Sequence, residues 1–326
     1  MGDNLTGIGA VIIGRNEGER LLACLDALGR QFDRVVYVDS GSSDGSVDAA
    51  KERGAEVVML ETDQPFTAAR ARNAGIAVLG EGAAPNFVQF IDGDCVLDPD
   101  WIPNARDFLM GNPEVAVVCG RRRERFPDVS VYNRMCDAEW NTPIGEATAC
   151  GGDALMRWSA VDAVGGYNPS LIAGEEPEMC LRMRKEGWKV WRLDLEMTMH
   201  DAAMTRFGQF WQRARRAGHA AAEAMMMYRT DPERPGFVAT RRALIWGTGI
   251  PALVLLGGIL LGPVVLWALM VYPLQIARLA IREGGSRFAW EQAVFLTLGK
   301  FAESRGILDY FSRRWRGQKT ELIEYK

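Results

Sequence analysis

The chain has 326 residues, which is longer than a typical single domain, and its formal net charge is −4. The small acidic excess argues against a general affinity for nucleic acid, and a hydrophobic share of 48% excludes a disordered chain. The six cysteines are scattered and form no Cys-x-x-Cys pair, which argues against a structural zinc site and favours buried thiols in a reducing compartment. We therefore expect one large folded domain with an appendage.

Short apolar runs alternate with stretches of helical spacing in the first part of the chain. The runs predicted as buried strands cover residues 10–13, 35–38, 57–60, 87–91 and 115–119. Helices are predicted over residues 21–28, 46–53 and 67–79, with Thr67 as an N-cap. Because strands without alternation are buried on both faces, this order favours an α/β fold with a doubly wound, mostly parallel sheet.

The pattern changes beyond residue 120. Residues 121–125 form a basic run that is predicted as a loop, and residues 190–193 form a further short strand. Helices are predicted over residues 159–164, 175–187, 206–228 and 295–315, the last two amphipathic and basic. Glycine pairs at residues 151–152 and 165–166 mark turns.

Residues 243–280 contain a single charged side chain, Arg278. Gly262 and Pro263 divide this stretch into residues 243–261 and 263–280, and each half approaches the roughly 20 residues that a helix needs to cross a bilayer. Arginines flank the two outer ends, which favours a transmembrane hairpin with both ends in the cytoplasm. A buried helical pair of a soluble core and a re-entrant or interfacial hairpin are the alternatives.

These patterns predict a first, α/β domain over residues 1–235 and a membrane hairpin with a basic amphipathic helix over residues 236–326. The polar first residues lead directly into a strand and do not resemble a secretory signal, so we expect the first domain in the cytosol. Close contacts at Gly257 and Gly258 would allow a homo-oligomer through the membrane helices.

The most informative motif is Asp92-Gly93-Asp94, which places two carboxylates at the end of a predicted strand. Like charges this close repel each other, and a divalent cation would neutralise both, whereas an ordinary Asp-Gly turn is the alternative. Asp39 also follows a strand, and ligands of such sheets bind beyond the carboxyl ends of the strands. Oxygen ligands and a phosphate partner favour Mg²⁺ or Mn²⁺ over zinc.

Four motifs occur in the order found in family 2 glycosyltransferases, and residues 9–220 resemble that family. The motifs are residues 11–17, residues 38–45, Asp92-Gly93-Asp94 and residues 173–176. The resemblance implies a GT-A (Rossmann-like) fold, a nucleotide-sugar donor and inversion at the anomeric carbon. The chain departs from the family where Gly14 and Arg15 replace the usual residues before Asn-Glu, and where Glu176 replaces an aspartate.

The resemblance also implies roles for the acidic residues. Asp94 would be the direct metal ligand, with Asp92 reaching the ribose or the metal through water. His200 is a candidate third ligand, although a lone histidine is more often structural. Glu176, with Glu175 as second choice, would be the base that accepts the proton of the acceptor hydroxyl; acids that complement a helix N-terminus are the alternative.

Further residues are predicted to contact the substrates. The set predicted to bind the nucleotide sugar is Asn16, Glu17, Asp39, Asp44, Arg70, Asn73, Asp92 and Gly152. Turn roles for the aspartates and a solvated helical face for Arg70 and Asn73 are the alternatives. Arg121, Arg122 and Arg123 are predicted to bind the donor diphosphate or the phosphate of a lipid-linked acceptor, unless they form a solvated loop.

We therefore predict a metal-dependent glycosyltransferase of the bacterial inner membrane, with its catalytic domain facing the cytosol. It would transfer a sugar to a polyprenyl-diphosphate-linked saccharide during cell-surface polysaccharide synthesis. A nucleotidyltransferase is a poorer fit, because residues 14–17 do not form a glycine-rich, lysine-containing triphosphate loop. A catalytically inactive scaffold on the same fold is the other alternative.

Overall fold

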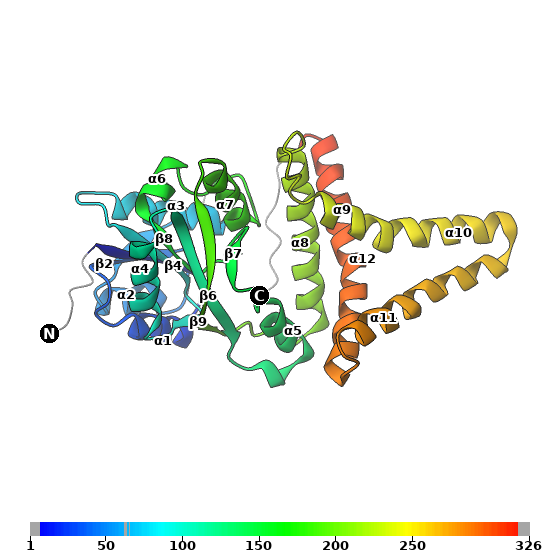
Figure 1. The fold of residues 1–326 in the computed structure, drawn as a ribbon, viewed down its shortest axis with the longest axis horizontal. Helices are drawn as coiled ribbons and strands as arrows, with labels where there is room; N and C mark the ends of the chain where they lie inside the picture. The colour runs from blue at the N-terminus through cyan, green and yellow to red at the C-terminus, as the bar shows by residue number, and fades with distance from the viewer. Residues whose placement is uncertain (1–6, 62–63, 65, 319–326) are drawn as a thin grey trace. The chain divides into compact units, whose positions relative to one another are not determined.

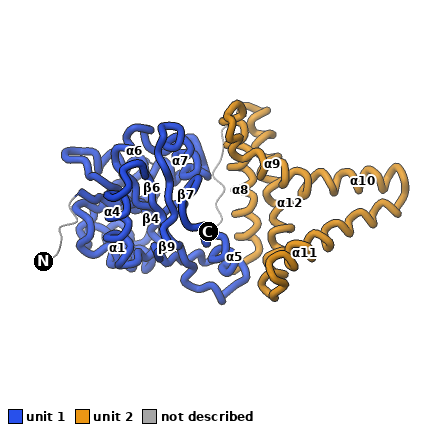
Figure 2. The backbone as a smooth tube through the Cα atoms, in the orientation of Figure 1, with its two compact units in different colours: residues 1–203 blue, residues 204–326 orange. Residues whose placement is uncertain are grey.

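The computed structural model describes residues 7–61, 64 and 66–318 (Figure 1). It divides into two compact units, residues 1–203 and 204–326 (Figure 2). Residues 204–235, which the sequence analysis assigned to the first domain, belong to the second unit.

The first unit is built around one sheet, to which the described residues contribute nine strands in the order β3-β2-β1-β4-β8-β6-β9-β5, with β7 paired to β9. The strands are β1 (Ile8–Gly14), β2 (Arg34–Asp39), β3 (Glu56–Met59), β4 (Phe87–Asp92), β5 (Cys95–Leu97), β6 (Val115–Glu124), β7 (Gly145–Ala147), β8 (Ala154–Arg157) and β9 (Lys189–His200). The helices are α1 (Glu19–Leu28), α2 (Ser46–Glu52), α3 (Ala68–Leu79), α4 (Trp101–Gly111), α5 (Val131–Glu139), α6 (Trp158–Ala163) and α7 (Glu175–Lys185), with a 3₁₀ turn at Pro127–Val129.

The α/β prediction is confirmed, and the sheet is mixed. Strands β3, β2, β1 and β4 are parallel, as their unbroken apolar runs indicate. The other half changes direction, because β8 lies antiparallel between β4 and β6, and both β5 and β7 run antiparallel to β9. The parallel half therefore brings the ends of β1, β2 and β4 to one edge of the sheet, where ligands of this fold class bind.

Several local predictions are confirmed, and one is wrong. Thr67 caps α3, since its hydroxyl accepts a hydrogen bond from the N–H of Arg70 at 3.2 Å. The basic run is not a loop, because β6 continues through it to Glu124 and pairs with β9 as far as His200. Alternation along this strand sends Arg122 to one face and Arg121 and Arg123 to the other.

The second unit is helical. Its elements are α8 (Phe207–Met227), α9 (Phe237–Leu244), a π-helical turn (Ile245–Gly249), α10 (Ile250–Leu261), a 3₁₀ segment (Pro263–Met270), α11 (Val271–Arg282) and α12 (Arg287–Trp315). Glycines let α8 and α12 approach closely: a Cβ at Gly218 would meet the backbone of Glu303, and one at Gly306 would meet the carbonyl of Arg215. A small apolar cluster of Ala222, Ala243, Ile307 and Tyr310 completes this junction.

Two helical stretches of the second unit are long and apolar enough to cross a membrane. They are Phe237–Leu261, with 25 residues, and Pro263–Arg282, with 20 residues. They project from α8 and α12 and meet at a tip (Figure 1). Only 6% of the most apolar 18-residue segment of each stretch is buried. The alternative of a buried helical pair within a soluble core is therefore not supported.

Candidate active site

A cluster of ionisable side chains, buried or partly buried, lies where β4 ends. Asp92 ends β4 and Asp94 follows it, while other members arrive from α3, β6, α7 and the end of β9. The residues of the cluster are Arg72, Asp92, Asp94, Arg122, Asp153, Glu175, Glu176 and His200. The sequence analysis named five of these as site residues outright and Arg122 as a phosphate ligand, and the fold brings them together.

Arg72 connects the two acidic motifs. Its Nη2 atom lies 2.9 Å from Asp92 Oδ1, and its Nη1 atom lies 2.7 Å from Glu176 Oε1 and 3.2 Å from Glu175 Oε1. The Arg72 side chain is only 3% exposed, and its guanidinium lies 5.4 Å from the centre of the Tyr167 ring. A single buried cation therefore holds three carboxylates that are distant in the sequence.

Gly152 makes this arrangement possible. A Cβ atom at this position would lie 2.7 Å from Arg72 Nη2 and 2.9 Å from an oxygen of Asp92. Contacts that short do not occur between real side chains, so any larger residue would push the pair apart. The structure places Gly152 against the charged cluster, and its predicted contact with the donor stays a prediction.

The second oxygen of Asp92 is held by Arg122. Nη2 of Arg122 lies 2.8 Å from Asp92 Oδ2, and its Nε atom lies 3.1 Å from Asp153 Oδ2. Asp153 also accepts hydrogen bonds from the Asp92 N–H at 3.0 Å and from the Thr198 hydroxyl at 2.7 Å. Burial opposes ionisation of Asp92, but the two arginines outweigh it and lower its pKa. Within the protein, these arginines supply the charge compensation that the sequence analysis attributed to a cation.

Asp94 and His200 form a second pair that is well suited to a metal ion. Asp94 Oδ2 lies 3.3 Å from His200 Nε2, and both side chains are at most 8% exposed. The other ring nitrogen, Nδ1, lies 3.9 Å from Glu124 Oε2 and has no hydrogen bond in the described part of the chain, and the ring lies edge-on to Trp140. Cys95 is close to both, but burial raises the pKa of its thiol well above the ordinary value, so the thiol stays protonated. Carboxylate oxygen and imidazole nitrogen are donors that Mn²⁺ accepts.

Glu176 has the properties of a base near neutral pH. It lies in the first turn of α7 beside Glu175, and its side chain is 14% exposed against 6% for that of Glu175. Burial, followed by the neighbouring charge of Glu175, raises the pKa of Glu176 to about 7, while Arg72 acts in the opposite direction. Efficient proton transfer requires a pKa close to the working pH.

The predicted donor-binding acids near β1 and β2 shape two loops. The buried carboxylate of Asp39 accepts hydrogen bonds from the N–H groups of Gly41 and Ser42 at 2.9 and 2.8 Å. Asp44 accepts from the N–H of Gly18 at 3.1 Å. Asn16, with a φ of 56°, accepts at its side-chain oxygen from the N–H of Ser43 at 2.8 Å, and Glu17 pairs with Arg20 at 2.7 Å. These contacts tie residues 14–18 to residues 39–46.

Four other predicted residues are engaged outside the cluster. Arg70 donates to the carbonyl of Gln64 at 3.1 Å, and Asn73 pairs with the backbone of Tyr167 at 2.7 and 2.8 Å. Arg121 and Arg123 both pair with Asp137, at 2.9 and 3.3 Å. Of the three adjacent arginines, Arg122 is the one that reaches Asp92.

Sequence reasoning missed Arg72 and the role of Asp153. Arg72 was passed over although it lies between Arg70 and Asn73, and although its spacing from Ala69 and Leu79 places it on the buried face of α3. Asp153 was noted only as part of a glycine-rich turn. A buried arginine on an otherwise apolar helix face is the signal that would have pointed to a nearby acidic cluster.

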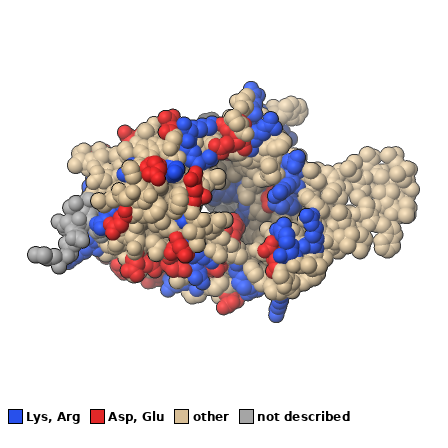
Figure 3. All heavy atoms as spheres, in the orientation of Figure 1, with Lys and Arg blue, Asp and Glu red and all other residues tan. Residues whose placement is uncertain are grey.

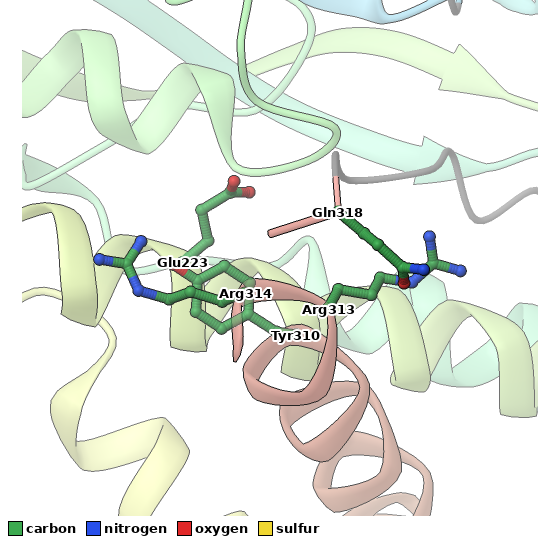
Figure 4. Close-up of a pocket in the computed structure, with 5 residues that line it drawn as sticks. All are labelled: Glu223, Tyr310, Arg313, Arg314 and Gln318. Atoms are coloured by element: carbon green, nitrogen blue, oxygen red, sulfur yellow. The ribbon is translucent and has the colours of Figure 1, made fainter. Parts of the chain in front are cut away.

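A polar pocket of about 270 Å³ lies in the second unit between α8 and α12, lined by Glu223, Tyr310, Arg313, Arg314 and Gln318 (Figure 4). Burial raises the pKa of Glu223 to about 7. The Arg313 and Arg314 side chains point in opposite directions (Figure 4), so their charges do not converge on one ligand position.

The sequence of this chain matches one family profile and is similar to two curated proteins. Residues 10–157 match the profile of glycosyl transferase family 2. The succinoglycan biosynthesis protein ExoA of Rhizobium meliloti is 25% identical over 231 residues, which cover 64% of this chain and 68% of ExoA. The O-antigen chain rhamnosyltransferase RfbN of Salmonella typhimurium is 24% identical over 193 residues, which cover 54% of this chain and 60% of RfbN.

The fold is similar to that of a solved mannosyltransferase. The structure of PcManGT from Pyrobaculum calidifontis, in complex with GDP-Man and Mn²⁺, matches with a TM-score of 0.64 at 16% identity, over 93% of this chain and 87% of that one. The profile match includes most of β1, all of β2 and the Asp92-Gly93-Asp94 motif. Residues 10–157 therefore match family 2 glycosyltransferases in sequence, and the fold of the chain is similar to that of the mannosyltransferase.

Proposed function

We propose that this protein transfers a sugar from a nucleotide-sugar donor to a lipid-linked acceptor, with inversion at the anomeric carbon. The observation that carries the proposal is the cluster in which Glu176 shares the Arg72 guanidinium with Asp92, two residues before Asp94. The names of two relatives support the setting, because one acts in succinoglycan biosynthesis and the other is an O-antigen rhamnosyltransferase. The acceptor class we favour is a polyprenyl-diphosphate-linked saccharide in bacterial cell-surface polysaccharide synthesis.

Glu176 performs the proton transfer in this proposal. With a pKa of about 7, a substantial share of its carboxyl groups is ionised at neutral pH and accepts the proton of the acceptor hydroxyl. The hydroxyl oxygen then forms a bond to the anomeric carbon while the bond from that carbon to the diphosphate oxygen breaks. Attack from the side opposite the leaving group inverts the configuration. Arg72 holds Glu176 in place through the 2.7 Å contact.

Asp94 and His200 are the residues that would hold Mg²⁺ or Mn²⁺. When bound, such an ion acts as a Lewis acid that stabilises the charge developing on the diphosphate. Asp39, Asp44, Asn16 and Glu17 would support the donor indirectly, by fixing the two loops at the ends of β1 and β2. Arg122, which already reaches this edge of the sheet, supplies positive charge for the phosphates.

Membrane attachment follows from the same proposal. The two apolar helical stretches of the second unit would anchor the enzyme to the bacterial inner membrane, with the glycosyltransferase domain on the cytosolic side. Confinement at the membrane raises the effective concentration of the enzyme toward a lipid-linked acceptor.

A thermal-shift screen of UDP-, GDP- and dTDP-sugars, with and without Mn²⁺, tests the donor class. A ligand that binds only the folded protein raises the melting temperature, and we expect one donor to do so in a Mn²⁺-dependent manner. Slow hydrolysis of that donor should require Mn²⁺ and should be lost in Asp94→Asn. Asp100→Asn is the matched control, because Asp100 is exposed and makes no side-chain cap hydrogen bond to α4.

The alternatives give different results in the same assay. A nucleotidyltransferase would form a nucleotide sugar from a nucleoside triphosphate and a sugar phosphate, with release of pyrophosphate. An inactive scaffold would turn over no nucleotide sugar under any metal condition. Either result contradicts the proposed transfer reaction.

A further inference from the structure

The projecting part of the second unit is an apolar arm, which we define as residues 249–271. Trp267 provides the only side-chain nitrogen in this stretch, and no side chain carries oxygen or charge. Ile259, Leu261 and Trp267 are 74, 75 and 74% exposed. The arm shows no charged atoms on the face drawn in Figure 3. A surface of this kind is stable only where something other than water covers it.

Both ends of the arm are fixed to α12. Gly247 packs so closely on the backbone of α12 that an added Cβ would meet the carbonyl of Lys300, and Thr248 bonds to Ser304. On the returning side, Tyr272 packs against Phe301 with ring centres 5.5 Å apart and donates to the carbonyl of Trp246 at 2.6 Å. The helical stretch of 25 residues therefore projects only beyond Thr248.

The free length of the arm is too short for a full membrane span. Helix α10 has 12 residues, which corresponds to about 18 Å at the usual rise of 1.5 Å per residue. The hydrocarbon core of a bilayer is about 30 Å thick. A tip that starts from the level of α12 would pass the middle of the membrane and end about 10 Å short of the opposite surface.

The tip has the chemistry of a turn that stays in hydrocarbon. The N–H of Gly262 donates to the carbonyl of Gly258 at 3.1 Å, and the carbonyl of Gly262 accepts from the N–H of Val265 at 3.3 Å. Pro263 has no N–H to satisfy. Leu261 and Val264, on either side of the turn, are 75 and 68% exposed. In hydrocarbon, each polar backbone group needs a partner within the protein, and the turn provides such partners. A loop exposed to water on the far side would need neither these internal hydrogen bonds nor the exposed apolar side chains.

The base of the arm has the chemistry of a membrane surface. Arg241 and Arg242 precede the arm, and Arg278 and Arg282 follow it. Cationic side chains on the membrane-facing side of a protein attract anionic lipid headgroups. Along the chain, Trp246 and Tyr272 lie between these arginines and the arm, and their ring centres are 5.9 Å apart. These two residue types favour the membrane interface.

We infer that the arm is a re-entrant hairpin that enters one leaflet, turns at Gly262 inside the hydrocarbon and returns to the same side, while α12 stays at the level of the headgroups. The inference rests on one part of the proposed function, which is attachment to a membrane. It does not depend on the chemistry of sugar transfer. It replaces a transmembrane hairpin by an anchor that leaves the opposite leaflet untouched.

Accessibility of a cysteine at the tip tests this inference. The protein with Leu261→Cys is treated with a membrane-impermeant maleimide in intact spheroplasts and in inverted membrane vesicles. We expect no labelling from either side and full labelling after detergent is added. Met110→Cys, at a 67% exposed position of α4, is the control that should react in inverted vesicles. The six native cysteines are all buried, so the unmodified protein provides a low background.

Two results would overturn the inference. Labelling of the tip cysteine in intact spheroplasts would show that the hairpin spans the membrane, and labelling in inverted vesicles would show that the arm lies outside the lipid. As a second variant, Leu261→Arg should remove most of the protein from the carbonate-resistant membrane fraction, since a re-entrant tip cannot bring the charge to water. Retention of Leu261→Arg at the wild-type level would equally contradict a tip in hydrocarbon.

Donor hydrolysis in detergent, measured on the same variants, separates anchoring from chemistry. Leu261 lies outside the charged cluster, so the rate should stay within twofold of the unmodified protein. If no variant and no wild-type protein hydrolyses any donor, the proposed function fails while the labelling result still decides the position of the arm.

Discussion

The two units treat charged and apolar side chains in opposite ways. In the first unit, Arg72, Asp153 and Glu175 are buried, and each forms an ion pair with a side chain of opposite charge. In the second unit, Leu261 and Trp267 are three-quarters exposed. A buried charge is stable only with a partner of opposite sign, and an exposed apolar arm is stable only in a medium other than water.

This difference shows that the two units depend on different partners. In the first unit, each buried charge needs a partner from a distant segment, so the charges determine which segments pack together. The exposed apolar residues of the arm indicate an external partner, because the described part of the chain leaves them uncovered. The following experiments break either the charge cluster or the helix packing and compare the results.

The largest effect is expected for loss of the base. Glu176→Gln preserves the size of the side chain but removes its ability to accept a proton, so kcat for sugar transfer should fall by about 10²- to 10⁴-fold. Glu186→Gln, at the exposed opposite end of α7, is the matched control and should leave kcat unchanged. A Glu176→Gln enzyme with near-normal kcat would assign the base to another residue.

Loss of the shared cation should unfold the first unit more easily. Arg72→Met leaves Asp92, Glu175 and Glu176 buried without their common partner, which should lower the free energy of unfolding by about 3–5 kcal/mol. Urea unfolding followed by near-UV circular dichroism measures the change. Arg53→Met removes a pair whose Asp26 side chain is 63% exposed, and it should lower the free energy of unfolding far less. An equal decrease in the free energy of unfolding in both variants would show that Arg72 stabilises the protein no more than an exposed arginine does.

Adding a single methyl group between α8 and α12 should destabilise the second unit. Gly306→Ala would place its Cβ against the carbonyl of Arg215, and overpacking of this kind costs about 1–3 kcal/mol. The matched control is Gly208→Ala at the start of α8, where a Cβ meets nothing within 4 Å, and where alanine should stabilise the helix by up to about 1 kcal/mol. Thermal unfolding in detergent compares the two, and a stabilising Gly306→Ala would contradict the close approach of α8 and α12.

The smallest effect is a pH dependence. Because the pKa of Glu176 is about 7, kcat/KM should fall about tenfold for each pH unit below that value as the carboxylate is protonated. The same shift makes the folded protein bind this proton more tightly than the unfolded chain does. Its contribution to stability is therefore fully present below the ordinary pKa of 4.5 and is lost as the pH rises through about 7. A rate that does not change between pH 5 and 8 would contradict the assignment.

The parallel half of the sheet could be predicted from the sequence, because each of its strands contains a run of mostly apolar residues. β8, with four residues, and β5 and β7, with three each, are too short to show a period and were missed. The two long basic amphipathic helices, α8 and α12, were also predictable, whereas α4, α5 and the continuation of β6 were missed. Arginines usually indicate a solvated segment, but in β6 each has an acidic partner that comes from another part of the chain.

The acidic members of the site were predictable for a similar reason. Asp92, Asp94 and Glu176 occur in short local motifs, so a pattern of a few residues identifies them. Arg72 and Asp153 gain their meaning only from contacts with residues 20 or more positions away. Such contacts depend on how the sheet closes, which no local pattern contains.

The grip of two arginines on Asp92 has a consequence for the order in which ligands arrive. Both carboxylate oxygens of Asp92 already accept a guanidinium hydrogen bond, so an ion held by Asp94 and His200 would bind close to a residue that two arginines already neutralise. The negative phosphates of a donor would offset the positive charge of these arginines and of the ion. We therefore expect ion and donor to bind cooperatively, each increasing the affinity of the other by the same factor. The protein without donor should accordingly bind Mn²⁺ more weakly by that factor.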